Sequence, residues 1–281
     1  MSSLGPASND EDLEVLIGSE LPSDTNDRTY YRILSRVGEG AMGVAFYAMR
    51  IAPEGECGVV VKILRPWFVQ QWGKTAELIV QKEAVALGRL NERVPPTPFV
   101  VRLIDTGSVQ IKSRGVLVRT PWLVVEYVHG GVEGTTLSQR VMHAIRTTGH
   151  AFDAQRAANL VEALGQGLSA VHEVGVIHRD IKPDNVLCCG FGNDEIFKIA
   201  DFGVARPTGV AATFGGFIVG TLGYAAPELA TMDAKAVGSW SDVFSMAAVI
   251  YFVLTGAEYF DVKSPSDALM AALAHTRRPI R

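Results

Sequence analysis

Cysteine is scarce in this sequence, and no disulfide framework can be built from it. Among 281 residues only Cys57, Cys188 and Cys189 occur, two of them adjacent, and no C-x-x-C pair is present. This scarcity excludes a small disulfide-stapled secreted domain and a zinc site built on cysteine pairs. We therefore expect the protein to work in a reducing compartment, with a cytoplasmic location.

Long hydrophobic runs are also missing. The longest, Val243–Leu254, is interrupted by Ser245 and is too short to span a bilayer. The N-terminus has neither the positive charge nor the apolar stretch of a signal peptide. The sequence therefore predicts no membrane segment in this chain, and it predicts that the apolar run forms a buried helix.

Basic residues are absent from the first 27 positions. This segment carries seven acids and therefore a charge of −7. Because the whole chain has a net charge of −4, the remaining residues are net positive. Its Ser, Asn, Gly and Pro content is typical of disorder, and we expect residues 1–27 to form a disordered acidic tail. Residues 13–17 are either a weak docking turn or, as the composition favours, part of a solvated tail without a role. The negative balance excludes a protein that coats nucleic acid, and we expect no nucleic-acid partner.

The residues that follow can bury a sizeable core, because 48% of the chain is hydrophobic. From residue 30 to about 126, alternating or β-branched segments predict strands, with one segment of helical spacing among them. The predicted strands are 30–37, 44–49, 59–64, 100–104 and 123–125, and the predicted helix is 76–90.

Helical spacing dominates after residue 126. Asp153 is the predicted N-cap of a helix that ends near Gly175. A β-rich part followed by an α-rich part predicts an α+β fold. Further helical patterns cover 225–232, 241–254 and 265–275.

A glycine-rich turn, Gly38-x-Gly40-x-x-Gly43, lies between two of the predicted strands. A dinucleotide-binding fingerprint requires a helix directly after the glycines, and here a strand follows. A glycine turn between strands lets backbone N–H groups approach phosphates. On this segment alone, an ordinary glycine hairpin is an equal alternative.

Lys62 is embedded in the apolar strand 59–64. A lysine at such a position costs free energy unless it meets an opposite charge. Glu83, on the apolar side of the predicted helix 76–90, is its natural partner. Such an ion pair would direct the ammonium group at a phosphate. The alternative is a snorkelling lysine and a solvated glutamate.

Residues 176–187 pack charged and hydrogen-bonding groups between two apolar pairs, and Asp201 follows after the short strand 197–200. Asn185 and Asp201 supply hard oxygen ligands that suit a divalent cation. Asp180 is placed to accept a proton. The alternative, a surface charge run, is disfavoured by the apolar residues on both sides.

Taken in chain order, these motifs resemble those of a eukaryotic-type (Hanks-type) serine/threonine protein kinase, and in style they are most similar to bacterial members. The resemblance covers about residues 30–281. The matching segments are Gly38-x-Gly40-x-x-Gly43, the strand that holds Lys62, Glu83, His178-Arg179-Asp180-x-Lys182-x-x-Asn185, Asp201-Phe202-Gly203, Gly220-Thr221, Ala226-Pro227-Glu228 and Asp242.

The resemblance implies a bilobal protein-kinase fold with a β-rich small lobe and an α-rich large lobe. It implies a kinase domain over 28–281, with the small lobe at 28–125, the hinge at 126–128 and the large lobe at 129–281. The implied activity is transfer of the γ-phosphate of ATP to serine or threonine hydroxyls of protein substrates in signalling. The implied cofactors are ATP and Mg²⁺, or Mn²⁺ in its place.

The resemblance also assigns roles to single residues. Lys62, oriented by Glu83, would hold the α- and β-phosphates, and Val125 would be a small gatekeeper beside the hinge. The implied ATP-binding residues are Val37, Gly38, Glu39, Gly40, Ala41, Met42, Gly43, Val44, Ala45, Lys62, Glu126 and Val128. Ala45 replaces the valine that usually packs on adenine, and Val44 is expected to compensate.

The implied catalytic base is Asp180, while Asn185 and Asp201 would bind the metal. Lys182 would steady the transferred phosphate. Lys182 and Thr221 together indicate that the substrate's acceptor residues are serine or threonine.

Arg179 would grip a phosphate on the activation segment. Thr213 is the expected phosphorylation site there, modified in trans within a homodimer; the alternative is an unmodified loop.

The end of the chain departs from the family pattern. Glu228 usually pairs with an arginine of the last large-lobe helices, and the arginines at 277, 278 and 281 come too early for that role. We therefore expect the last helices to be missing and the chain to be a fragment; the alternative is that a partner or a dimer covers the gap. The main alternative function is an inactive, pseudokinase-like binding scaffold, which the intact Lys62 and Asp180 argue against. A kinase for small molecules is disfavoured by the segment 220–228, which shapes a peptide groove.

Overall fold

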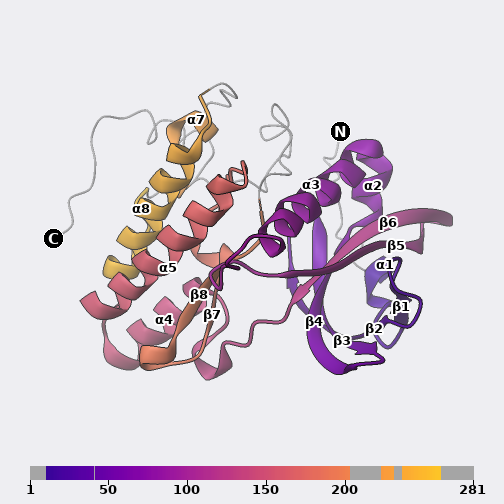
Figure 1. Cartoon of the computed structure of the whole chain (residues 1–281), viewed down its shortest axis with the longest axis horizontal. Coiled ribbons are helices and arrows are strands. Elements are labelled where there is room, and N and C mark those ends of the chain that lie inside the picture. The colour runs from indigo at the N-terminus through magenta and orange to yellow at the C-terminus, as the bar shows by residue number, and fades with distance from the viewer. Residues whose placement is uncertain (1–10, 41, 203–222, 231–235, 261–281) are drawn as a thin grey trace, which may run out of the picture. The chain divides into compact units, whose positions relative to one another are not determined.

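The computed structural model describes residues 11–40, 42–202, 223–230 and 236–260. The chain divides into two compact units (Figure 1). The first unit comprises residues up to Ala84 together with Arg102–Tyr127, and the second comprises Val85–Val101 together with the residues from Val128 onward. The division after Tyr127 falls within the predicted hinge.

The first unit is built on a six-stranded antiparallel sheet with the strand order β1-β2-β3-β4-β6-β5. Three helices accompany it, and the last of them continues past residue 84 into the second unit. The strands are β1 (Glu20–Pro22), β2 (Tyr30–Glu39), β3 (Gly43–Ala52), β4 (Gly55–Leu64), β5 (Leu103–Ser113) and β6 (Val116–Glu126), and the helices are α1 (Glu11–Glu14), α2 (Pro66–Trp72) and α3 (Lys74–Asn91).

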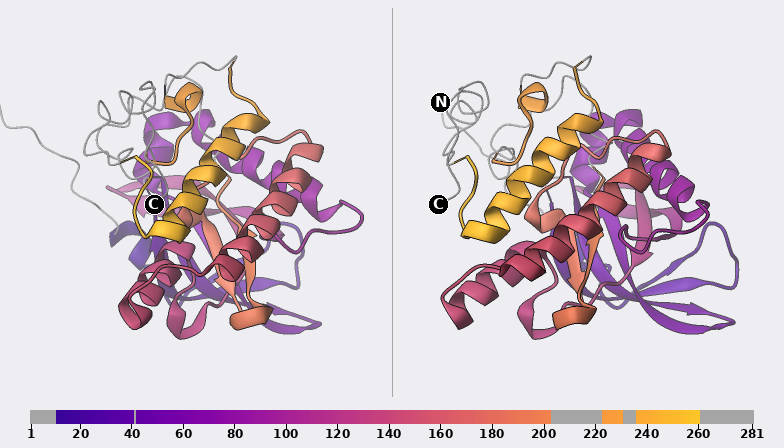
Figure 2. Two further views of the ribbon diagram at one scale, coloured as in Figure 1. Left: turned by 90° about the vertical axis from the view of Figure 1, so that its left-hand side faces the viewer. Right: turned by 60° about the vertical axis from the view of Figure 1, so that its left-hand side comes forward.

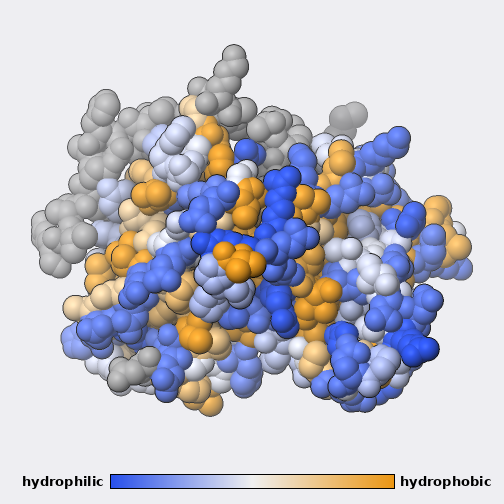
Figure 3. All heavy atoms as spheres, viewed as in Figure 1, coloured by the Kyte–Doolittle hydropathy of each residue, from blue (hydrophilic) through white to orange (hydrophobic). Residues whose placement is uncertain are grey.

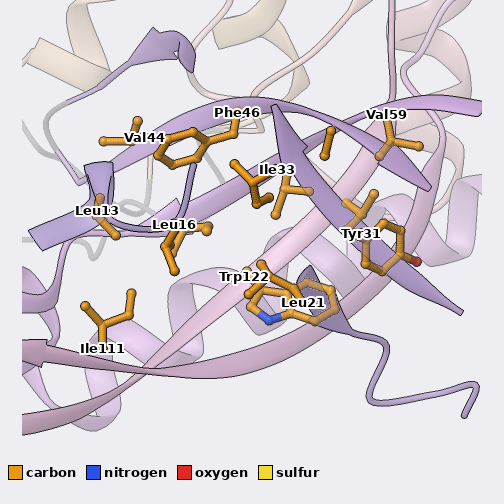
Figure 4. Packing of buried hydrophobic residues seen from close by; sticks show 14 residues of the cluster. Leu13, Leu16, Leu21, Tyr31, Ile33, Val44, Phe46, Val59, Ile111 and Trp122 are labelled. Atoms are coloured by element: carbon orange, nitrogen blue, oxygen red, sulfur yellow. The ribbon is translucent and has the colours of Figure 1, made fainter. Parts of the chain in front are cut away.

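The core of the first unit lies on one face of this sheet (Figure 4). Strand alternation decides which side chains reach it, because successive residues point to opposite faces. In β4, Val61 and Ile63 are buried in this cluster, and Lys62 lies between them in the sequence. The other face of the sheet therefore receives Lys62. The predicted strands 30–37, 44–49 and 59–64 and the predicted helix 76–90 are confirmed, whereas the strand predicted at 100–104 starts later, at residue 103.

The expected disordered tail is wrong for residues 11–27. This segment forms α1 and β1, and β1 pairs with β2 at the edge of the sheet. Leu13, Leu16 and Leu21 are buried in the core cluster beside strands that come later in the chain (Figure 4). Burying three leucines offsets the entropy of ordering a short acidic segment, and composition alone does not reveal that gain. Residues 1–10 lie outside the described part.

The second unit is mainly helical. Helices α5 and α8 lie side by side (Figures 1 and 2), and α5 packs against the small two-stranded sheet β7–β8. The elements are η1 (Gly131–Glu133), α4 (Leu137–Thr148), α5 (Ala154–Glu173), η2 (Pro183–Asn185), β7 (Val186–Cys189), η3 (Gly192–Asp194), β8 (Ile196–Ile199), α7 (Pro227–Ala230) and α8 (Ser239–Thr255).

Helix boundaries in the second unit follow their caps. Asp153 accepts a hydrogen bond from the backbone N–H of Arg156 at 2.8 Å, which confirms it as the N-cap of α5. Helix α4 was not predicted, although Thr136 and Gln139 form a capping box at its start, a local signal that was present in the sequence. The helix expected over 265–275 lies outside the described residues.

The surface shown in Figure 3 carries hydrophilic side chains interspersed with hydrophobic ones. Within the described ranges, no helix combines the length and the apolar character needed to cross a membrane. The apolar run 243–254 belongs instead to α8, where Val249 and Val253 are fully buried.

Candidate functional site

The glycine turn connects β2 to β3 as a hairpin, which confirms the predicted order of strand, glycine turn and strand. The last strand pairs are Gly38 with Ala45 and Glu39 with Val44, and the Gly40 N–H donates to the Gly43 carbonyl at 2.9 Å. A Cβ atom on Gly43 would lie 2.6 Å from the carbonyl oxygen of Ile63. Only glycine fits there, because the backbone of β4 passes directly against the turn.

Lys62 and Glu83 form the predicted ion pair, with Lys62 Nζ 3.3 Å from Glu83 Oε1. The side chains retain 23% and 13% of their exposure, so the pair is largely withdrawn from water. Lys62 lies on the central strand β4 and pairs with Ala45 on β3 and Leu123 on β6. A rigid sheet therefore sets the position of the ammonium group, and α3 provides its counter-charge.

Val44 does not belong with the expected nucleotide-contacting side chains. It pairs with Ile63, and its side chain is buried in the core cluster on the opposite face from Lys62. Ala45, the partner of Lys62, shares the face of that lysine. The idea that Val44 compensates for the small Ala45 is therefore wrong, because neighbouring residues of a strand point to opposite faces.

The predicted gatekeeper and the start of the hinge lie at the end of β6. Val125 is buried and pairs with Val60, which puts it on the Lys62 face of the sheet. The Glu126 N–H donates to the Arg102 carbonyl at 3.0 Å, and the Glu126 carboxylate accepts the Arg102 N–H at 3.0 Å. The N–H of Glu126 is thus committed within the sheet. Val128 is a buried residue of the second unit.

In the second unit, Asp242 anchors the segment that holds Asp180. Asp242 is fully buried at the start of α8; its Oδ2 accepts the His178 N–H at 2.9 Å, and its Oδ1 accepts the Arg179 N–H at 2.8 Å. His172 Nε2 lies 2.8 Å from Oδ2, a contact that the sequence did not reveal. Arg179 has a φ of +67°, which is unfavourable for a side-chain-bearing residue, and these bonds hold it there.

The ring of His178 joins this segment to the one before Asp201. It is fully buried, with Nε2 3.1 Å from the Ala200 carbonyl oxygen and Nδ1 3.2 Å from the backbone nitrogen of Asp180. A backbone N–H can only donate, so Nδ1 is the acceptor and Nε2 carries the hydrogen. His178 is therefore the neutral Nε2–H tautomer, and its ring also packs against Phe202, with ring centroids 4.7 Å apart.

Lys182 and Asn185 both contact one carboxylate oxygen of Asp180. Asn185 Nδ2 donates to the Asp180 carbonyl at 2.8 Å and to Asp180 Oδ2 at 2.9 Å, and Lys182 Nζ lies 3.3 Å from the same Oδ2. The side chain of Asp180 is only 10% exposed. Two donors on Oδ2 fix the plane of the carboxylate, and charge assistance makes these bonds strong.

Asn185 and Asp201 lie at the same end of the β7–β8 hairpin. Val186 pairs with Ile199, and the Ala200 N–H donates to the Asn185 carbonyl at 2.9 Å. The Asn185 amide nitrogen is used by Asp180, which leaves the amide oxygen as a ligand atom, and Asp201 adds a carboxylate. These hard oxygen donors fit Mg²⁺, which typically takes one or two protein ligands and completes its shell with phosphates and water. Within the described ranges, no group of three or more His, Cys, Asp or Glu side chains could hold a metal ion by itself.

Several predicted site residues lie outside the described residues: Ala41 in the glycine turn, and Thr213 and Thr221 in the activation segment.

Arg179 Nε is buried and has no hydrogen-bond partner in the described part of the chain. Glu228 accepts the hydroxyl of Ser241 at 2.5 Å.

Comparison with known proteins identifies the family. The model of the protein kinase domain matches residues 31–278, so the chain belongs to the protein kinase family. Membership implies the use of ATP with a divalent cation and of protein substrates.

Within the family, the chain is similar to bacterial serine/threonine-protein kinases. It is 30% identical over 252 residues to the probable serine/threonine-protein kinase PkwA of Thermomonospora curvata, covering 88% of this chain and 29% of that protein. It is 31% identical over 262 residues to PknB of Mycolicibacterium smegmatis, covering 91% of this chain and 36% of PknB. The chain therefore spans about a third of the length of these curated relatives.

A solved structure confirms the fold. The kinase domain of PknI from Mycobacterium tuberculosis, solved as a double mutant, is similar with a TM-score of 0.58 at 20% identity. The match covers 89% of this chain and 79% of that one. The predicted α+β protein-kinase fold is thus confirmed.

Proposed function

We propose that this chain transfers the γ-phosphate of ATP to serine and threonine hydroxyls of protein substrates. The observation that carries the proposal is the hydrogen-bonded set in which Asn185 and Lys182 both contact Oδ2 of Asp180. A scaffold that only bound nucleotide would have no need of a buried, oriented carboxylate beside a lysine. The names of the bacterial relatives support the same activity.

Residues of the first unit, together with Val128, would hold the nucleotide. Lys62 binds the α- and β-phosphates, and Glu83 keeps its ammonium group in place. The glycine turn offers backbone N–H groups without a Cβ to block their approach. The hinge residues Glu126 and Val128 offer backbone groups to adenine. Val37 and Ala45 provide apolar contact with the base.

The residues of the second unit would hold the metal. Asn185 and Asp201 are the protein ligands of Mg²⁺, or of Mn²⁺ in its place. When bound, the metal neutralises charge on the phosphates.

Asp180 orients the substrate hydroxyl and accepts its proton. The hydroxyl oxygen forms a bond to the γ-phosphorus, the bond from that phosphorus to the bridging oxygen breaks, and the electron pair leaves with ADP. Lys182 compensates the charge on the moving phosphoryl group. Because Asn185 and Lys182 fix the carboxylate beforehand, little reorganisation is needed during transfer.

Regulation through the activation segment is part of this proposal. The buried Nε of Arg179, with no partner in the described residues, suits a phosphate on that segment. Thr213 is the proposed acceptor, modified by a second copy of the chain in trans, and Thr221 is proposed to contact Asp180 and Lys182. As domain limits we propose a small lobe that ends at the hinge 126–128, with residues 11–27 added to it.

The test uses labelled ATP with Mg²⁺ and a generic protein substrate. We expect label on serine and threonine, lost in Asp180→Asn and retained in Asp184→Asn, an exposed neighbour in the same segment. Nucleotide binding without transfer would instead support the scaffold. Label on tyrosine alone, or on small molecules alone, would contradict the proposed acceptor. Mass mapping of the active chain tests Thr213.

A further inference from the structure

Arg65 makes contact with both sides of the glycine turn. It follows β4 directly, its backbone N–H donates to the Met42 carbonyl at 2.8 Å, and its Nε donates to the Gly40 carbonyl at 3.3 Å. Gly40 and Met42 flank the tip of the turn. One residue thus binds the carbonyls on each side of that tip, and this arginine lies outside the kinase motifs of the sequence.

The same guanidinium also binds an acidic side chain of the turn. Arg65 Nη2 lies 3.3 Å from Oε2 of Glu39, and Arg36 Nη2 contacts the same oxygen from β2. Arg36 further reaches Glu14 of α1, with Nη1 3.4 Å from Oε1. The carboxylate of Glu39, the second residue of the glycine motif, therefore lies between two arginines.

Burial distinguishes Arg65 from an ordinary surface arginine. Its side chain is 9% exposed, whereas that of Arg32, which pairs with Glu20 on the same sheet, is 46% exposed. Burial lowers the pKa of Arg65, the direction expected when a charge is withdrawn from water. A guanidinium is buried at a cost that only fixed, well-oriented acceptors offset. Two of its acceptors, Gly40 and Glu39, belong to the glycine turn.

We propose that Arg65 and Glu39 form a clasp that positions the glycine turn for the nucleotide. Arg65 is a positioning residue, since it acts through the turn and not by touching ATP. The clasp restricts the turn to one arrangement before ATP arrives, so less conformational freedom is lost on binding. This inference rests on the proposed function for its effect on ATP. Its effect on the turn itself does not depend on that function.

The test compares Arg65→Gln, Arg65→Lys and Glu39→Gln with Arg32→Gln, the exposed arginine on the same sheet. Loss of a charge-assisted clasp predicts a rise of roughly tenfold in KM for ATP in Arg65→Gln, with a smaller change in kcat at saturating ATP. Arg65→Lys should recover part of the affinity, because it keeps the charge. The double variant Arg65→Gln, Glu39→Gln should be little worse than either single one, because both remove the same contact.

A second measurement needs no ATP. Hydrogen exchange of the amides in 38–43 should be faster in Arg65→Gln than in the parent or in Arg32→Gln, at temperatures where all three are folded by circular dichroism. Unchanged exchange and unchanged KM in Arg65→Gln would overturn the clasp, as would equal effects of Arg32→Gln. If the parent chain does not bind ATP, the proposed function fails, and the exchange data still decide the clasp.

Discussion

Ser23 donates its hydroxyl to the buried carboxylate of Asp105 at 2.5 Å, across 82 positions of the chain. The same carboxylate accepts the hydroxyls of Thr25 and Tyr31, each at 2.8 Å. Burial, followed by the neighbouring carboxylate, raises the pKa of Tyr31, so this phenol stays a donor at all physiological pH values. The segment before β2 is thereby tied to β5.

Asp105→Asn should destabilise the first unit by about 1.5–3 kcal/mol, because a neutral amide replaces a charged acceptor. The amide NH2 group would also face hydroxyls that donate to Asp105 in the parent. The measurement is the free energy of unfolding from urea titration. Asp27→Asn, an exposed acid nearby, should change it little. Equal stability of the two variants would show that the Asp105 contacts carry no net energy.

Leu13→Ala should cost about 2–5 kcal/mol, because Leu13 is 1% exposed within the core cluster. Val15→Ala on the same short segment is the matched control, since Val15 is 72% exposed. Thermal unfolding checks both variants. A Leu13 variant as stable as the Val15 variant would argue that residues 11–22 are not part of the folded unit.

Asp242→Asn should reduce phosphoryl transfer by about 10²-fold while ATP binding stays close to that of the parent. The asparagine side chain has one acceptor oxygen, whereas the backbone N–H groups of His178 and Arg179 each need one. The segment from His178 to Asp180 therefore loses its position. The measurement is kcat together with the Kd for ATP. Asp153→Asn, which keeps an acceptor at the N-cap of α5, should leave kcat near the parent value.

Lys62→Met and Glu83→Gln should be non-additive. The lysine variant should lose roughly 10²-fold or more of kcat/KM, the glutamate variant less, and the double variant no more than the lysine variant. Glu77→Gln, an exposed glutamate on the same helix, should have little effect. Additive losses in this double-mutant cycle would mean that the 3.3 Å pair does not act as one unit.

Glu195→Gln should destabilise the second unit by about 3–5 kcal/mol, because it removes the nearer of two counter-charges of the fully buried Arg140 and leaves only Glu133, at 3.6 Å. Arg140 Nη1 and Arg156 Nε each lie 2.6 Å from an oxygen of Glu195. Glu162→Gln, exposed on α5, is the control for the loss of one carboxylate. Urea titration with a probe in the second unit gives the comparison, and equal midpoints would refute the prediction.

Local patterns were enough to predict most of the elements and the ion pair. The strand that holds Lys62 is a run of mostly β-branched residues, the helix that holds Glu83 has a periodicity of 3.6 residues, and a buried lysine requires a partner. The capping box at Thr136 is an equally local signal, and it marks the start of α4. The expected compensation by Val44 is wrong because neighbouring strand residues point to opposite faces, and the register between β3 and β4 pairs Lys62 with Ala45.

The sequence by itself determined which chemical groups the chain offers, because the identities and order of Lys62, Glu83, Asp180, Asn185 and Asp201 are linear information. Only the tertiary structure decided that residues 11–27 pack into the first unit and what holds its glycine turn. Leu13 meets the core, Ser23 meets Asp105 and Arg65 meets Glu39 through contacts between distant positions. The energy of such contacts depends on burial and geometry, which neither composition nor local periodicity contains.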